Sequence, residues 1–242
     1  MGSKVHKEKG DGESKSGRTG LPFSASVTAD PPTKARLINN LTARYSQPRK
    51  GIHVSDLVYC LRASAFRKLS PKPSSEKELS YYCSGKACHD VIEGLHGARR
   101  EVEHTWEGIV AHFDLLEEEI PVEIKSSRSP NREIKKHWIR QLGYYCAVRG
   151  VEHGRLVILY LFPQRATKEN PTPTADMIQT FEVKFQKIEE VRRDLRARRD
   201  LLSEALKAGN PALAPTADRE TAWLCDDCAY RNECAELGGC RQ

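Results

Sequence analysis

The strands at the centre of the predicted fold come from residues 111–125, AHFDLLEEEIPVEIK. Apolar residues crowd its first half, three glutamates interrupt them, and alternation resumes afterwards, which predicts two short strands with a polar break between them. Because successive side chains of a strand point to opposite faces, Glu123 and Lys125 lie on the same face of the second strand. If the two strands pair, Asp114 on the first strand reaches the same place. The stretch therefore predicts an aspartate, a glutamate and a lysine that converge beside a sheet.

Such a cluster has a chemical use in hydrolysis. Two carboxylates hold a hard divalent cation such as Mg²⁺ and leave coordination positions open for water and a phosphate oxygen. The lysine then orients that water or helps to deprotonate it. A Glu-x-Lys sequence on a strand is common, however, and usually marks a solvated face. The chemical interpretation therefore depends on the rest of the chain.

Length and composition limit the classes of protein to which this chain can belong. The 242 residues suffice for one sizeable domain, or a domain with appendages, and for a substantial core. The longest apolar run, at residues 156–162, has the length of a buried strand and not of a membrane span. Residues 1–20 lack the apolar segment of a secretory signal, so we expect a cytoplasmic protein with no membrane partner. In that compartment the eight cysteines indicate metal or cluster ligation, or buried thiols, rather than disulfides.

The net charge of +6 is unevenly placed. Residues 1–50 hold ten Lys/Arg and four Asp/Glu, so the excess of positive charge lies entirely in that segment. Residues 1–32 are rich in Gly, Ser, Lys and Pro and have little to bury, which predicts a disordered basic tail before a domain at residues 33–242. The tail adds salt-sensitive attraction to nucleic acid, or it is only a solubilising extension.

The remaining secondary structure is predicted from apolar periodicity and from Gly and Pro signals. Helices are predicted at residues 33–45, 54–69, 81–97, 131–148 and 187–208, and further strands at 156–162 and 177–185. Ser55 or Asp56 is the expected N-cap of the second helix, and Gly150 ends the fourth. The third helix carries His89 and Glu93. This order indicates an α/β fold with a mixed sheet flanked by helices.

The C-terminal tail carries a cysteine pattern typical of a metal site. Cys225, Cys228 and Cys234 give C-x2-C-x5-C, and Cys240 follows six residues later. A C-x2-C turn presents two thiolates to one centre, and a third cysteine in the same short loop argues against accidental spacing. A zinc site needs a fourth ligand, which Cys240 can supply, whereas an iron-sulfur cluster can take its fourth thiolate from far away, for which Cys60 is the candidate. Buried, inert thiols are the default interpretation of the remaining cysteines, Cys83, Cys88 and Cys146.

Several motifs, in a fixed order, resemble those of one enzyme family. They are a lone cysteine (Cys60), Gly-x-x-x-His (Gly85, His89), a strand aspartate (Asp114), Glu-x-Lys (Glu123, Lys125), Gln-x-x-x-Tyr (Gln141, Tyr145) and the C-x2-C-x5-C tail. The set spans about residues 52–235 and resembles RecB-like nucleases of the PD-(D/E)XK superfamily, most closely the CRISPR-associated exonucleases known as the fourth Cas protein. The chain departs from that pattern in two places. Ala111 stands where a glycine often precedes the motif aspartate, and Cys240 is an extra cysteine.

The resemblance implies a restriction-endonuclease-like core and a role for each motif residue. The implied ligands of Mg²⁺ or Mn²⁺ are His89, Asp114, Glu123 and the carbonyl of Ile124. Lys125 is implied to position the attacking water and to counter charge that develops on the phosphate. Gln141 and Tyr145, four residues apart on one helix face, are implied to lie near the DNA strand.

The resemblance also implies a cofactor in the tail. The implied ligands of a [4Fe-4S] cluster are Cys60, Cys225, Cys228 and Cys234. Such a cluster ties the helix that carries Cys60 to the tail at residues 225–240, like a staple. Because cluster binding then contributes to folding, its loss is expected to destabilise the protein and not only to slow it.

The function implied by the resemblance is metal-dependent DNA exonuclease activity on single-stranded DNA ends, with 5′-to-3′ polarity. The implied role is to trim DNA for CRISPR spacer acquisition alongside the Cas integrase complex. Two alternatives remain. A RecB-like nuclease of viral or cellular repair and recombination carries the same motifs. A non-catalytic, zinc-stapled module would hold nucleic acid without cutting it, but such a binder has no need for a carboxylate pair that repels phosphate.

Overall fold

The computed structural model describes residues 29–45, 49–96, 99–129, 132–162, 176–219 and 221–239. The predicted basic tail spans residues 1–32, of which residues 1–28 lie outside the described residues. The first helix begins at Pro31, within the last part of that predicted tail. The elements are α1 (Pro31–Tyr45), β1 (Ile52–His53), α2 (Val54–Val58), α3 (Leu61–Leu69), α4 (Glu76–His96), β2 (Arg99–Trp106), β3 (Ile109–Glu117), β4 (Ile120–Ser127), α5 (Lys136–Arg149), β5 (His153–Tyr160), β6 (Ile178–Lys184), α6 (Ile188–Lys207), η1 (Pro211–Leu213), η2 (Ala222–Cys225) and α7 (Arg231–Glu236).

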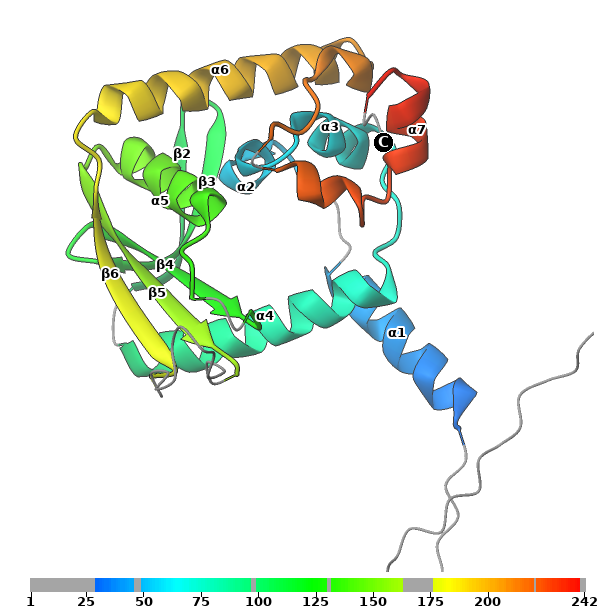
Figure 1. Ribbon diagram of the computed structural model, residues 1–242, viewed down its shortest axis with the longest axis horizontal. Helices are drawn as coiled ribbons and strands as arrows, with labels where there is room; N and C mark the ends of the chain where they lie inside the picture. Colours follow the sequence, from blue (N-terminus) through cyan, green and yellow to red (C-terminus); the bar gives the residue numbers. More distant parts are fainter. Residues whose placement is uncertain are drawn as a thin grey trace, which may run out of the picture.

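The strands form one mixed sheet, as predicted. Its order is β1-β3-β4-β5-β6, and β2 also pairs with β3. The β1–β3 and β4–β5 pairs are parallel, while β2–β3, β3–β4 and β5–β6 are antiparallel. Helices α5 and α6 lie on one side of the strands and the long helix α4 crosses on the other (Figure 1). The expected α/β architecture of a mixed sheet flanked by helices is therefore confirmed.

The hairpin of β3 and β4 is the pair of strands that residues 111–125 predict. Its pairing runs from Leu115 opposite Val122 to the turn. The turn residues Glu118 and Glu119 have φ values of 51° and 71°. Two successive residues of positive φ make the turn whose twist matches that of the two strands it joins. The polar break in the sequence is therefore a tight hairpin turn.

Strands β1 and β2 were not among the sequence predictions. The β2 sequence RREVEHTW has few apolar positions, so periodicity gives little signal. It is a strand because it pairs along most of β3, from Arg99 opposite Leu116 to Trp106 opposite Ile109. β1 has only two residues, which is too short for any period to be seen. Pairing with β3 decides both elements.

The helix predicted at residues 54–69 is divided into two. α2 ends at Val58 and α3 begins at Leu61, so that Cys60 becomes the N-cap of α3. The prediction of Ser55 or Asp56 as N-cap was wrong, because α2 starts after His53. Asp56 instead accepts the backbone N–H of His53 at 2.8 Å, which satisfies an amide that the helix leaves without a partner.

The start of the fourth predicted helix also differs from expectation. α5 begins at Lys136, five residues after the predicted start at position 131. Its end is as predicted, because Gly150 adopts the left-handed conformation with φ 76° and caps the last turn. The helix packs into the core through several buried residues, which include Trp138, Leu142, Tyr145 and Ala147.

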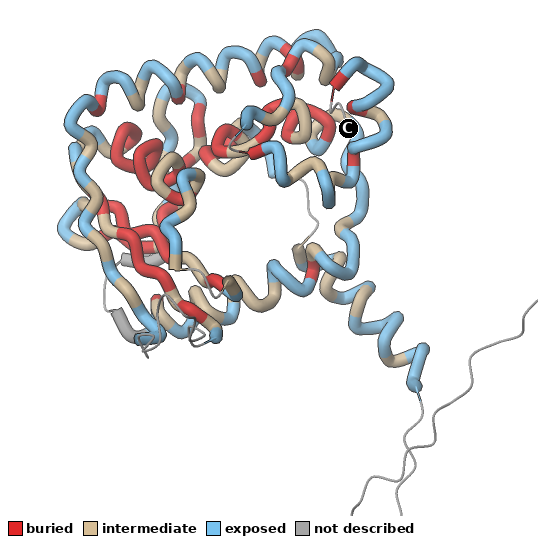
Figure 2. The backbone as a smooth tube through the Cα atoms, in the orientation of Figure 1, coloured by how far each residue is buried: buried red, intermediate tan, exposed pale blue. Residues whose placement is uncertain are grey.

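The two faces of the sheet bury different amounts of apolar surface. The main core lies between the sheet and helices α2, α3, α5 and α6, where buried residues gather (Figure 2). A smaller cluster of Leu115, Val122, Ile124 and Val157 packs against Ile92 of α4. Among the described residues, no helix is both long and apolar enough to cross a lipid bilayer.

Close packing of β5 against α5 makes Gly154 a sensitive position. A Cβ added there would lie 2.7 Å from Leu142 Cδ1 and 2.9 Å from Cys146 Sγ. We expect Gly154→Ala to lower the free energy of unfolding by about 1–3 kcal/mol, because both neighbours are fully buried and cannot move away freely. Gly85→Ala is the matched control, since nothing lies within 4 Å of the added Cβ and alanine favours a helix. Urea denaturation of both variants tests this, and equal stabilities would contradict it.

Candidate active site

Asp114 lies where β3 and β4 stop pairing. The register of the two strands ends at Leu115 opposite Val122, and farther along β4 the pairing is with β5. At this point the backbone N–H of Ile124 donates to Asp114 Oδ2 at 2.8 Å. A side chain thus replaces a ladder bond between the strands, which satisfies a buried donor and fixes the carboxylate at the point of divergence.

Glu123 and Lys125 form a close ion pair on β4. Lys125 Nζ lies 2.5 Å from Glu123 Oε1, and the Glu123 side chain is almost fully buried. Burial raises the pKa of the Glu123 carboxyl to about 7, against the opposing effect of the Lys125 charge. Burial lowers the pKa of Lys125, but the nearby negative groups, with Glu123 the largest of them and Tyr59 and Asp114 next, together outweigh burial and leave that pKa above its usual value. The ammonium group therefore stays charged beside the carboxylates.

Lys125 is also held by the two predicted residues of α5. Its Nζ donates to Gln141 Oε1 at 3.0 Å, and Gln141 Nε2 donates to the Tyr145 hydroxyl at 3.2 Å. The Tyr145 ring packs against Phe113, with centroids 5.0 Å apart, and only 5% of Tyr145 is exposed. Gln141 and Tyr145 therefore lie behind Lys125 and fix the direction of its ammonium group. Their predicted proximity to the DNA strand stays a prediction.

A second group of ligand-type side chains comes from α4. His89 Nδ1 lies 3.5 Å from Asp114 Oδ1 and 4.0 Å from Glu93 Oε1. One ligating atom from each of His89, Glu93 and Asp114 lies within 4.8 Å of the other two. Burial lowers the pKa of His89, but the hydrogen bond and charge of Asp114 outweigh it and raise the pKa above its usual value. A nitrogen and two carboxylates here form a donor set suited to a divalent cation.

Glu93 is the residue of this group to which the sequence analysis gave no role. The available signal was its spacing of four residues from His89, which puts both side chains on one face of α4. Only 6% of Glu93 is exposed. A carboxylate buried to this extent needs a partner for its charge, and His89 and the candidate cation site supply one.

The residues present fit the divalent cation that the resemblance implies. Both carboxylate oxygens of Glu123 are buried and accept no hydrogen bond of good geometry from the residues that the structure describes. Their contact with Lys125 is ionic only. A buried carboxylate with spare acceptor capacity, next to the His89, Glu93 and Asp114 group, is suited to an oxygen-seeking metal ion. The Ile124 carbonyl as a further ligand stays a prediction.

Two cysteines of the tail, Cys228 and Cys234, lie near Cys60 at the start of α3. Burial raises the pKa of Cys60, and charges on Cys228 and Cys234 raise it further, so these three thiols are neighbours. Cys234 and Cys228 pack with Phe66 of α3 and with Tyr230, whose ring stacks on Phe66 at 5.2 Å. None of the seven cysteines in the described part of the chain is in a disulfide. Cys240 lies outside the described residues.

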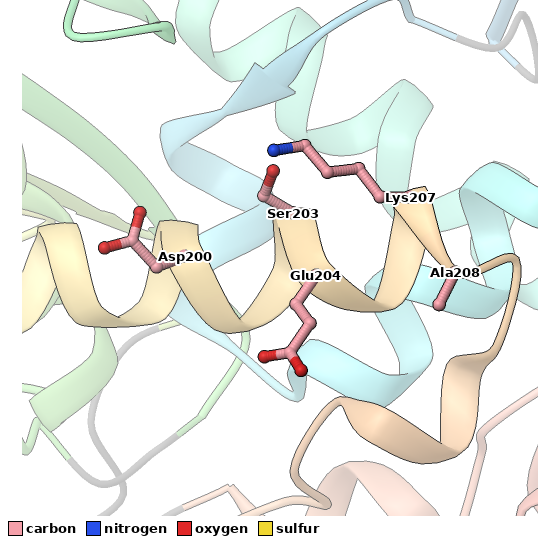
Figure 3. A pocket seen from close by; sticks show the side chains of 5 residues that line it. All are labelled: Asp200, Ser203, Glu204, Lys207 and Ala208. Carbon is pink, nitrogen blue, oxygen red and sulfur yellow. The ribbon is translucent and has the colours of Figure 1, made fainter.

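A hollow on the described surface lies away from this site (Figure 3). It has a volume of about 560 Å³, and its lining consists of Asp200, Ser203, Glu204, Lys207 and Ala208 at the end of α6. Charges of both signs line it, and it contains no residue of the group around Asp114. We assign it no role.

Comparison with known families gives one match that covers most of the chain. The model described as the PD-(D/E)XK nuclease superfamily matches residues 86–235, a span that holds every candidate site residue except Cys60 and Cys240. Among solved structures, the crystal structure of SSO0001 is similar, with 19% sequence identity and a TM-score of 0.55. The similarity covers 85% of this chain and 97% of that chain, and at this identity it supports the fold alone.

Two further solved structures are similar at lower scores. One is an alkaline exonuclease, LHK-Exo, from Laribacter hongkongensis, with 13% identity over 70% of this chain and 95% of that chain and a TM-score of 0.41. The other is a phage-related exonuclease from Haemophilus somnus 129PT, with 12% identity over 64% and 82% and a TM-score of 0.40. These scores carry no argument about this chain. A search of curated proteins gave no match.

Proposed function

The chain belongs to the PD-(D/E)XK nuclease superfamily, and from that premise we propose that it is a divalent-metal-dependent DNA exonuclease acting on single-stranded ends. The observation that carries the proposal is the convergence of Asp114, Glu123 and Lys125 where β3 and β4 diverge. His89 and Glu93 face the same point from α4. Acidic ligands around one cation beside a fixed ammonium group suit phosphodiester hydrolysis and have no use in simple DNA binding.

Each residue has a distinct part in the proposed reaction. His89, Asp114, Glu123 and Glu93 would hold Mg²⁺ or Mn²⁺, together with the Ile124 carbonyl. When bound, the metal supplies Lewis acidity toward phosphate oxygens and lowers the pKa of a coordinated water. The Lys125 ammonium orients the attacking water and counters negative charge that develops on the phosphate. Gln141 positions Lys125 through the 3.0 Å hydrogen bond, and Tyr145 holds Gln141 in turn.

We also propose that Cys60, Cys225, Cys228 and Cys234 bind a [4Fe-4S] cluster. The proximity of Cys60 to Cys228 and Cys234, which are far away in sequence, supports this ligand set. The ordered set of motifs in the sequence, which includes the distant Cys60, is what favours this cluster over a zinc site.

The biological role that we propose is processing of DNA for CRISPR spacer acquisition, alongside the Cas integrase complex. Its support is the ordered set of motifs from Cys60 to Cys234 in the sequence. A RecB-like nuclease of viral or cellular repair has the same active site. The genes that flank the coding sequence would distinguish these two roles.

A single preparation tests the catalytic proposal. The protein is purified without oxygen, its visible spectrum and its iron and zinc contents are measured, and end-labelled single-stranded DNA is offered in Mn²⁺. We expect a brown, iron-containing protein that shortens the labelled strand from one end and stops when a chelator removes the metal. A colourless, zinc-containing protein that binds DNA without cutting it would replace the proposal with the non-catalytic module.

Glu93 gives a prediction specific to the metal site. We expect Glu93→Gln to raise the Mn²⁺ concentration for half-maximal cleavage by about tenfold, because one anionic donor of the group is lost. The matched control is Asp90→Asn, on the same helix but exposed and paired with Lys86. Mn²⁺ titrations of the cleavage rate measure both variants. Equal midpoints in Glu93→Gln and wild type would remove Glu93 from the metal site.

A further inference from the structure

Three aromatic side chains from distant parts of the chain form a row near the candidate active site. Tyr59 follows α2, His137 lies in the first turn of α5 and Trp223 lies in η2. The ring centroids of Tyr59 and His137 are 5.3 Å apart, and those of His137 and Trp223 are 5.7 Å apart. Both distances lie in the range of direct ring contact. The row therefore runs from Tyr59 through His137 to Trp223.

One end of the row lies within the electrostatic field of the candidate active site. Burial is the main cause that raises the pKa of Tyr59, and the charges of Lys125 and Glu123 are the next largest influences. Burial also lowers the pKa of His137, to about 4, and Lys125 has the largest effect among the charges that act on it. The same lysine thus acts on two successive rings. His137 is uncharged at neutral pH, which leaves it a neutral stacking surface.

The other end of the row is open to solvent. Trp223 is 55% exposed, whereas Trp138 in the same region is only 7% exposed. A single exposed apolar residue is ordinary on a protein surface. Trp223 differs because its ring continues a row of aromatic contacts that leads inward. The exposed part of Trp223 is thereby open to a ligand at the outer end of the row.

Cations accompany the rings. Besides Lys125, the positive charges of Lys135 and Arg140 act on His137. Arg140 is held in place because it donates to the Val58 carbonyl and pairs with Asp218 at 3.2 Å. Flat aromatic rings next to cations match the two parts of a nucleotide, since bases stack on rings and phosphates pair with positive charge.

We propose that Tyr59, His137 and Trp223 form a stacking platform that receives an unpaired base of single-stranded DNA and leads the strand toward Lys125. This inference rests on the proposed nuclease function and adds to it the residues that select the substrate. Bases inside a duplex are covered by their neighbours, so only an unpaired strand or an open end presents a free base face to Trp223. Stacking is tolerant of sequence, because every base has a planar face.

Steady-state degradation of a labelled oligonucleotide in Mn²⁺ is the first part of the test. Trp223→Ala raises KM about tenfold and changes kcat by less than about twofold, since the loss of one stacked base weakens binding by about this factor. Trp223→Phe keeps a ring and stays within about threefold of wild type. Leu201→Ala, an exposed apolar position on α6, is the matched control and leaves KM unchanged. An unchanged KM in Trp223→Ala would overturn the platform.

A binding measurement on abasic oligonucleotides is the second part, and it separates stacking from indirect effects. Binding is measured in Ca²⁺, by polarisation of a labelled strand, with one base removed at each position in turn. At one position, removal of the base lowers the affinity of the wild type about tenfold but does not lower the affinity of Trp223→Ala. Equal losses in both proteins at every position would overturn the inference. Wild-type protein that binds with this pattern but cleaves no DNA in Mn²⁺ would contradict the nuclease function and leave the platform standing.

Discussion

Replacing Lys125 by methionine is expected to reduce DNA cleavage by at least about a hundredfold while the protein stays folded. Methionine keeps the apolar stem of the side chain and removes only the ammonium group. That group lies 2.5 Å from Glu123 and 3.0 Å from Gln141, so no other cation of the described site can take its position without rearrangement. The loss therefore falls on the chemical step, as a decrease in the cleavage rate constant measured under single-turnover conditions.

The fold survives this change because Glu123 can become neutral. Burial already raises its pKa to about 7, so loss of the Lys125 charge moves the carboxyl further toward its protonated form. Thermal unfolding followed by circular dichroism checks this point. Lys184→Met is the matched control, because Lys184 is a strand lysine on β6 whose side chain is 75% exposed. Cleavage by Lys125→Met within tenfold of wild type would remove Lys125 from the active site.

Asp114→Asn gives an independent measurement on the same site. The asparagine oxygen still accepts the Ile124 N–H, so the divergence of β3 and β4 is preserved while one negative charge is lost. We expect a loss of cleavage similar to that of Lys125→Met, together with a higher Mn²⁺ concentration for half-maximal cleavage. Full activity in this variant would contradict the assignment of Asp114 as a metal ligand.

Replacing Cys228 by alanine is expected to give a colourless protein whose melting temperature is lower by about 10 °C or more. The proposed cluster connects Cys60 at the start of α3 to a tail that has little core of its own. Around these cysteines the buried apolar contacts are those of Phe66, Tyr230 and Cys234. Ion pairs such as Lys77–Asp227, at 2.7 Å, are exposed and contribute little to stability. Loss of the cluster therefore releases the tail.

Cys146→Ala is the matched control for the cysteine prediction. Cys146 is fully buried in the main core, where its sulfur faces Gly154. Removing that sulfur loses packing contacts, which lowers the free energy of unfolding by about 1 kcal/mol, and it leaves the visible spectrum unchanged. Absorption spectra, iron analysis and thermal unfolding of both variants make the comparison. An unchanged visible spectrum in Cys228→Ala would refute its ligation of the cluster.

Much of the fold follows from local patterns in the sequence. The hairpin at residues 109–127, the apolar strand β5, the end of α5 at Gly150 and the mixed α/β order are all expressed as periodicity or as turn signals. Local patterns do not predict an element that forms only because it pairs with a neighbouring strand. The two residues of β1 and the charged strand β2 are strands because β3 pairs with them. The division between α2 and α3 could not be predicted from the sequence either, since apolar periodicity continues across Tyr59 and Cys60.

Alternation along the sequence predicts that Glu123 and Lys125 share one face of β4, and spacing identifies the cysteine tail. The contacts between elements cannot be predicted in this way. Packing joins Lys125 of β4 to Gln141 of α5, puts Glu93 of α4 beside Asp114, brings Cys60 to Cys228, and sets Trp223 against His137. A period records which way a side chain points along one element, whereas proximity between elements follows from how the whole core packs.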